Sequence, residues 1–254
     1  MHRARPIILL TAVIILAACS SEGGFVSVDQ KFGYRIPDSG YYTVSRGDTL
    51  YAIAFRYGLD YRQLASANSI PYPYTIYPGQ KIDVRGGGSA PVTPGPVAVK
   101  KPSVQPGGSV QPPQVTTPGA GKPPEMPADA QVSQWIWPAN GKIVARFSAS
   151  KPVNKGIDIG TSLGEPVLAA AAGTVVYAGT GLRGYGNLII VRHNDRFLSA
   201  YAHASRILVR ENQTIKAGEK IAETGSTGTD EVKLHFEIRE NGKPVDPLRF
   251  LPGM

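Results

Sequence analysis

The chain has 254 residues and a formal net charge of +8 at pH 7. This length allows one or two folded domains at about 100–200 residues each, and a hydrophobic content of 42% excludes a chain that is disordered throughout. The single cysteine excludes an internal disulfide and a cysteine-rich zinc motif, while the excess of basic side chains favours anionic partners such as nucleic acid, lipid headgroups or cell-wall polymers.

The N-terminus has the pattern of an export signal. Basic side chains precede an apolar run over residues 7–18, which is shorter than the ~20 residues that a membrane-spanning helix needs. The run ends in Ala17-Ala18-Cys19, followed by Ser20. This resembles a bacterial lipobox, although an ordinary signal peptide with an incidental cysteine is an alternative. The resemblance implies that residues 1–18 are removed, that Cys19 carries fatty acyl chains such as palmitate, and that the lipoprotein is sorted to the outer membrane. We therefore expect no nucleic-acid partner.

A compact periodic block follows a polar tether over residues 19–40. Residues 42–44 favour a short strand, and apolar side chains then recur at helical spacing until Gly58. Asp48 or Thr49 can cap this helix, and Asp60 can cap a second one. A turn and a returning strand over residues 78–84 complete a βααβ unit.

This block, residues 41–85, resembles a LysM module. The matching segments are Tyr42-Thr43-Val44, Gly47-Asp48-Thr49-Leu50 and Pro78-Gly79-Gln80-Lys81-Ile82. The resemblance implies binding of peptidoglycan or related N-acetylglucosamine-containing glycans between two loops. The implied glycan-binding residues are Gly47, Asp48, Thr49 and Leu50 on one side, and Ser69, Ile70 and Pro71 on the other. A purely structural role of Asp48 and Thr49 as helix caps is the alternative.

Residues 86–130 form a spacer of biased composition. They hold 11 of the 22 prolines and almost no large apolar side chains. Proline is excluded from helix interiors and central strands, and so few apolar residues bury too little surface to order the segment. We expect a disordered linker that reaches at most ~140 Å when extended at about 3.1 Å per residue.

The remaining residues, 131–254, predict an antiparallel all-β domain. Short β-prone segments alternate with glycine turns, and no long segment has helical periodicity. The predicted strands cover residues 144–147, 167–170, 174–177, 188–191, 197–201, 220–222 and 234–238. The three histidines of this domain, His193, His203 and His235, are its first candidates for chemistry, although a single histidine in a β-protein is more often structural.

The surroundings of the last two histidines resemble the LytM/lysostaphin-like zinc endopeptidases. The resemblance rests on Gly156-Ile157-Asp158-Ile159, Gly184-Tyr185-Gly186-Asn187, Tyr201-Ala202-His203 and Leu234-His235-Phe236-Glu237. It implies zinc ligands at a His and an Asp four residues apart and at the second His of a His-x-His strand. A further His in a Tyr-Ala-His segment, together with the first His of the pair, would act on the water and the oxyanion.

Two positions depart from that pattern. Asn154 stands where the first ligand should be, and Lys233 stands where the first His of the pair should be. Asp158 and His235 then remain as ligands, whereas catalytic zinc normally has three from the protein. Lys233 adds a cation that repels a metal ion. We expect no zinc, no cofactor and no catalytic residue.

The order of signal, LysM module, proline-rich spacer and degenerate LytM domain resembles the NlpD-type murein hydrolase activators. The resemblance implies activation of a zinc-dependent N-acetylmuramoyl-L-alanine amidase of the AmiC type at the division septum. An active murein DD-endopeptidase of the LytM type and a structural link between outer membrane and murein are the alternatives. The expected amidase-contacting cleft comprises Asn154, Asp158, Arg183, Tyr185, His203, Lys233 and His235.

Overall fold

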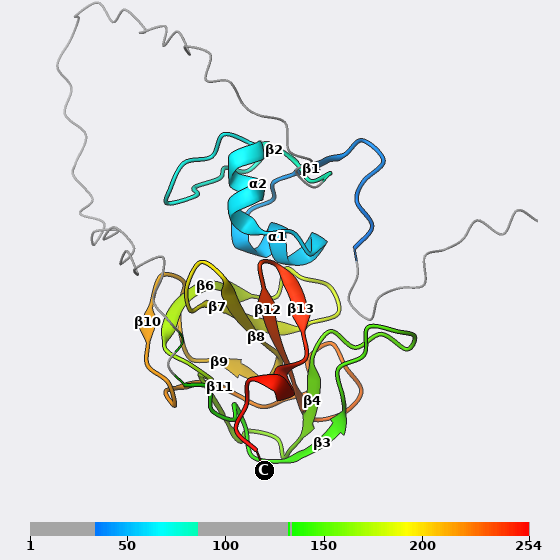
Figure 1. Cartoon of the computed structure of the whole chain (residues 1–254), viewed down its shortest axis with the longest axis vertical. Coiled ribbons are helices and arrows are strands. Elements are labelled where there is room, and N and C mark those ends of the chain that lie inside the picture. Colours follow the sequence, from blue (N-terminus) through cyan, green and yellow to red (C-terminus); the bar gives the residue numbers. More distant parts are fainter. Residues whose placement is uncertain (1–33, 86–131, 133, 254) are drawn as a thin grey trace, which may run out of the picture.

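The computed structural model describes residues 34–85, 132 and 134–253 (Figure 1). The expected signal peptide, Cys19 and the proline-rich spacer lie outside the described residues. Within the described part of the chain, no helix has the length and apolarity needed to cross a membrane.

The N-terminal module has the predicted βααβ order. Its elements are β1 (Tyr41–Thr43), α1 (Leu50–Tyr57), α2 (Tyr61–Ala67) and β2 (Lys81–Asp83), and β1 pairs with β2 in antiparallel register. The Thr49 hydroxyl accepts from the Ala52 N–H at 3.1 Å, which makes Thr49 the cap of α1. The Asp60 carboxylate caps α2, and Gly58 ends α1 in the left-handed conformation, φ +66°.

The C-terminal domain is mainly antiparallel β structure, as predicted. A large sheet has the order β10-β6-β7-β8-β12-β4-β3 with β13 paired to β12, and a small sheet has the order β5-β11-β9. The elements are β3 (Lys142–Ala145), β4 (Ile157–Gly160), β5 (Pro166–Leu168), β6 (Gly173–Gly179), β7 (Asn187–Arg192), β8 (Phe197–Ala204), β9 (Arg206–Ile207), β10 (Thr214–Ile215), β11 (Lys220–Glu223), β12 (Lys233–Glu240), β13 (Lys243–Val245) and the 3₁₀ helix η1 (Pro247–Arg249).

The sequence did not predict strand β4 or the short strands β9, β10 and β13. Each of these spans two to four residues, which is too short for a period-2 pattern to stand out. Strand β4 matters for function, because it places Asp158 opposite His235 on β12.

Strand β7 of the large sheet is apolar on both faces. On β7, Ile189 and Val191 enter the main core between the two sheets, while Leu188 and Ile190 point to the opposite face. Successive side chains of a strand alternate between faces, so a strand that is apolar at every position needs cover on both sides.

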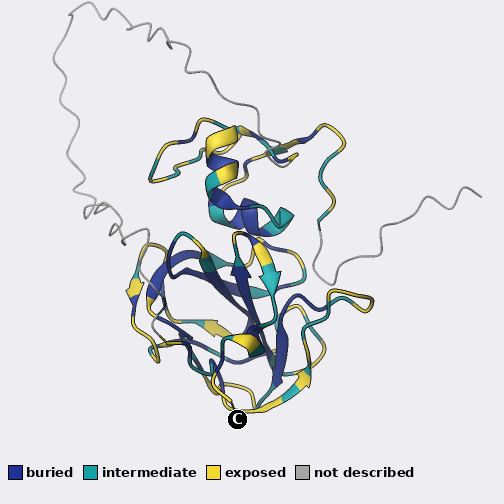
Figure 2. Ribbon diagram, in the orientation of Figure 1, coloured by how far each residue is buried: buried dark blue, intermediate teal, exposed yellow. Residues whose placement is uncertain are grey.

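Helix α1 provides the cover on the second face. Ala52 and Phe55 belong to the same buried cluster as Val176, Leu188 and Ile190 of the sheet. Figure 1 shows α1 lying across the edge of the sheet near β6, β12 and β13, and Figure 2 shows its buried side turned toward them. The two modules therefore share a buried cluster, a contact that the sequence pattern does not predict.

Candidate functional site

A row of polar side chains runs along one face of β12. Lys233, His235, Glu237 and Arg239 alternate with Leu234, Phe236 and Ile238, which enter the main core. Because the side-chain period of a strand is two, the four polar groups share one face. His235, Glu237 and Arg239 are all at most 1% exposed, so their charges have to be satisfied by neighbours.

Asp158 holds the first two members of this row. Strands β4 and β12 place Asp158 directly opposite His235, and Asp158 Oδ1 lies 2.6 Å from His235 Nδ1. The other carboxylate oxygen, Oδ2, forms an ion pair with Lys233 Nζ at 3.2 Å. Both oxygens of the carboxylate are thus in contact with cationic or N–H groups.

His235 lies between two carboxylates. Its Nε2 is 3.1 Å from Glu237 Oε1, opposite the contact of its Nδ1 with Asp158. Burial by itself lowers the pKa of His235, but the hydrogen bonds to both carboxylates outweigh burial and raise it. Since both ring nitrogens face carboxylate oxygens, both can donate only in the protonated imidazole.

The row continues to the first module through Arg239. Glu237 accepts from Tyr185 Oη at 2.8 Å and from Arg239 Nε at 2.7 Å. Although burial raises the pKa of Glu237, the charges of Arg239 and His235 lower it to about 2. Arg239 Nη1 in turn donates to the carbonyl oxygen of Phe55 at 2.6 Å.

The groups at this position do not fit a zinc ion. An imidazolium has no nitrogen lone pair for a metal, and the ammonium of Lys233 already balances the charge of Asp158. The amide nitrogen of Asn154 donates to the Arg146 carbonyl at 3.1 Å and serves the local backbone. Residues 34–85 and 134–253 contain no cluster of three or more His, Cys, Asp or Glu side chains suited to a metal ion.

His203 lies beside His235 but is held differently. Their ring centroids are 6.1 Å apart, and His203 Nδ1 donates to the Thr227 carbonyl oxygen at 2.8 Å. Burial lowers the pKa of His203 to about 4, so it is neutral at pH 7. The backbone of His203 is left-handed, φ +66°, a conformation that is uncommon outside glycine but enriched in histidine.

The structure brings most of the expected cleft together. Asp158, Tyr185, His203 and His235 lie in one contiguous network, with Lys233 at its edge. All members of the expected cleft except Arg183 and Lys233 are buried. A partner protein therefore has direct access to few of these side chains while α1 covers the sheet.

His193, the remaining histidine of the domain, is structural. Its ring nitrogens lie 2.8 Å from the Ala172 carbonyl oxygen and 2.7 Å from Ser199 Oγ, and the ring packs against Trp135. Burial lowers the pKa of His193 to about 4. It contacts none of the residues of the polar row that the structure describes.

A pocket of about 200 Å³ lies at the start of α1. Its first wall contains the expected glycan-binding residues Asp48, Thr49 and Leu50. The second wall comes from residues 73–76, whereas Ser69, Ile70 and Pro71 are not among the lining residues, and neither is Gly47. The pocket thus includes three of the seven expected glycan-binding residues.

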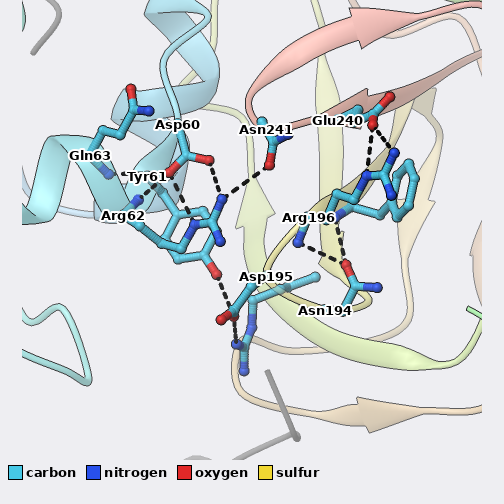
Figure 3. A network of polar contacts seen from close by, with 11 residues as sticks. Asp60, Tyr61, Arg62, Gln63, Asn194, Asp195, Arg196, Glu240 and Asn241 are labelled. Atoms are coloured by element: carbon cyan, nitrogen blue, oxygen red, sulfur yellow. Dashed lines mark hydrogen bonds and ion pairs between the residues drawn. The ribbon is translucent and has the colours of Figure 1, made fainter. Parts of the chain in front are cut away.

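Polar contacts fix the docking of α1 and α2 on the C-terminal domain. The Gly58 carbonyl at the end of α1 accepts from Lys243 Nζ at 2.8 Å, close to the Arg239 contact with Phe55. Cations at a helix C-terminus stabilise its unpaired carbonyl groups. Figure 3 shows the second contact region, in which Tyr61 Oη donates to Asp195 at 3.0 Å and Arg62 donates to Asn241 at 3.1 Å.

Comparisons with known proteins agree with the two modules. Residues 42–85 match the family model of the LysM domain, and residues 152–247 match that of peptidase family M23. The chain is 50% identical to the lipoprotein NlpD/LppB homolog of Pseudomonas aeruginosa, over 96% of this chain and 91% of the relative. The chain belongs to the NlpD-type lipoproteins, with a LysM module and a LytM-like domain.

Other NlpD-type proteins are similar over much of their length. The chain is 41% identical to the murein hydrolase activator NlpD of Salmonella typhimurium, over 91% of this chain and 74% of the relative. It is also 41% identical to the outer membrane antigenic lipoprotein B of Haemophilus influenzae, over 83% of this chain and 64% of the relative.

Proposed function

We propose that this chain is an outer-membrane lipoprotein that activates a murein hydrolase. It is anchored through Cys19 at the periplasmic face, and its LysM module binds peptidoglycan. Its C-terminal domain switches on a zinc-dependent N-acetylmuramoyl-L-alanine amidase of the AmiC type, and it acts at the division septum during the separation of daughter cells.

The ion pair between Lys233 and Asp158 carries the regulatory part of this proposal. An M23 peptidase needs a metal ion to lower the pKa of its attacking water toward about 7. Here the Lys233 ammonium balances the charge of the Asp158 carboxylate at 3.2 Å, and the two ring nitrogens of His235 contact the carboxylates of Asp158 and Glu237. A domain that keeps the M23 fold without these conditions is suited to binding rather than hydrolysis, in line with the activator name of its Salmonella relative.

The sheet face beneath α1 is the surface best suited to bind the amidase. To shift the ratio of open to closed amidase from 1:99 to 99:1, the activator has to bind the open form about 5.5 kcal/mol more tightly than the closed form. Exposed charge pairs contribute about 0–1 kcal/mol each, so contacts with the exposed Arg183 are insufficient, and Lys233 is largely buried against Asp158. The apolar cluster around Ile190 and Leu198 offers a larger contribution, at about 25 cal/mol per Å² of apolar surface, from which the cost of displacing α1 from the same surface is subtracted.

We therefore propose that the amidase replaces α1 on the sheet. Displacement of α1 exposes the apolar cluster together with Tyr185 and Arg239, which α1 covers through Phe55. Asp158, His203 and His235 support this surface through the network described above, whereas Asn154 serves the local backbone.

The direct test measures release of dye from labelled sacculi by an amidase, with and without the full mature chain. We expect stimulation by the chain and no release by the chain alone. Dye release without the amidase favours the alternative of an active endopeptidase. Retention on sacculi without any stimulation favours a structural tether between outer membrane and murein.

A further inference from the structure

The pocket at the start of α1 is built by both modules. Residues 48–51 and 73–76 of the LysM module form two of its sides, while Val176, Glu211 and Asn212 of the C-terminal domain form another. The last two residues belong to a turn between β9 and β10 that lies far from the LysM module in the sequence.

Backbone hydrogen bonds hold this turn against β6. The Asn212 N–H donates to the Val175 carbonyl at 2.8 Å, and the Val175 N–H donates to the Gln213 carbonyl at 2.9 Å. Asn212 adopts the left-handed conformation, φ +65°, and so does Tyr74 on the LysM side, φ +64°. Asparagine tolerates this conformation, whereas for tyrosine it is uncommon and points to a functional constraint.

The lining chemistry suits a neutral, hydroxyl-rich ligand. Tyr51 and Tyr74 contribute aromatic surface, with ring centroids 6.0 Å apart, and Thr49, Thr75 and Asn212 contribute polar groups. Glu211 is exposed and accepts one long hydrogen bond of 3.4 Å from the Ala178 N–H, so its carboxylate has acceptor positions open to a ligand hydroxyl. The Glu211 carboxylate disfavours an anionic ligand, whereas Arg56 balances the charge of Asp48 at 3.9 Å.

The size of the pocket limits the ligand further. Its volume of about 200 Å³ lies below the range of about 300–1,000 Å³ that drug-sized ligands occupy. It is several times the space that one water molecule needs. One sugar ring with its acetamido group is a ligand of this scale.

We propose that Glu211 and Asn212 are glycan-contacting residues, so that an N-acetylated amino sugar is held jointly by the LysM module and the C-terminal domain. This inference rests on the proposed peptidoglycan binding and extends it, because it assigns part of the sugar site to the LytM-like domain. Since the site is complete only while α1 is docked, sugar binding and docking stabilise each other.

The test measures binding of tri-N-acetylchitotriose to the full mature chain by titration calorimetry. We expect Glu211→Ala to weaken binding about tenfold, as loss of a charge-assisted hydrogen bond implies. Asn212→Gly, which keeps the left-handed backbone accessible, should also weaken binding. Glu231→Ala, an exposed acidic residue between β11 and β12, is the matched control and should bind like the wild type.

A second arm tests the dependence on docking. Ala52→Glu places a charge in the apolar contact between α1 and the sheet, and in this background Glu211→Ala should have no further effect on sugar binding. Unchanged or tighter binding by both single variants, or an undiminished Glu211 effect in the Ala52→Glu background, would overturn the inference. If the wild type fails to bind the trisaccharide, the proposed glycan binding fails as well, which separates the two failures.

Discussion

At the scale of single residues, the most informative position is Lys233. Its ammonium stands 3.2 Å from Asp158 and supplies the positive charge that a metal ion would otherwise provide. The sequence alone identified Lys233 and Asn154 as departures from the peptidase pattern. The contact of Glu237 with the second nitrogen of His235 was not predicted, although residues two apart on a strand share one face and the two lie on the predicted strand 234–238.

Restoring the peptidase residues should restore metal binding. In the Asn154→His/Lys233→His variant, Asp158 loses its cation and gains a third ligand nearby, so we expect about one zinc ion per chain after dialysis. Metal analysis checks this result. Lys233→Met is the control, since it removes the cation without adding a ligand and should remain nearly free of zinc. About one zinc ion in the wild type would contradict our account of the site.

The buried histidine His193 predicts a pH dependence of stability. Its pKa is lowered to about 4 in the folded domain, against about 6.5 in an unfolded chain. The unfolded state therefore binds more protons between pH 4 and 6.5, so stability falls as pH is lowered through this range. Between pH 7 and 5 we expect His193 to contribute about 1–2 kcal/mol of this loss.

Urea denaturation of the wild type and His193→Gln at both pH values checks this prediction. The variant is expected to be less stable at pH 7 but to lose less stability on acidification. Since His203 and His235 are unchanged in both proteins, their contributions cancel in the difference. An identical loss in the two proteins would show that His193 is not the responsible group.

At the scale of elements, β12 and α1 define the site together. The period of β12 was visible in the sequence, with apolar residues at 234, 236 and 238, and so was the amphipathic pattern of α1. Their contact was not, because Arg239 and Phe55 lie in different modules separated by the spacer. The continuous apolar run at residues 188–191 is a signal of burial on both faces that could have indicated a covering element.

Removal of the Arg239 guanidinium should be costly. Arg239→Met leaves Glu237 buried without its partner cation and the Phe55 carbonyl without its donor. Breaking a buried pair in this way costs about 3–5 kcal/mol. The free energy of unfolding in urea measures the loss. Arg249→Met, at an exposed position of η1, should change it by less than about 0.5 kcal/mol, and equal effects of both substitutions would contradict the assigned role.

At the scale of the whole molecule, two modules with known folds become one unit. Both folds and the βααβ order were predictable, since each rests on local motifs and periodicity. The docked arrangement was not, because it depends on surfaces that only the folded modules present. In our two proposals, a sugar held by both modules favours the docked form and an amidase on the sheet face favours the undocked form, so the two ligands would oppose each other through the docking equilibrium.

The central claim is that the sheet face beneath α1 is the amidase-activating surface. The direct measurement compares amidase turnover on dye-labelled sacculi with the wild type, Ala52→Glu and Ser66→Glu, the last carrying the same charge on an exposed position of α2. We predict greater stimulation by Ala52→Glu than by the wild type, because its apolar face is uncovered, and unchanged stimulation by Ser66→Glu. Equal or weaker stimulation by Ala52→Glu, with both modules still folded, would contradict the claim.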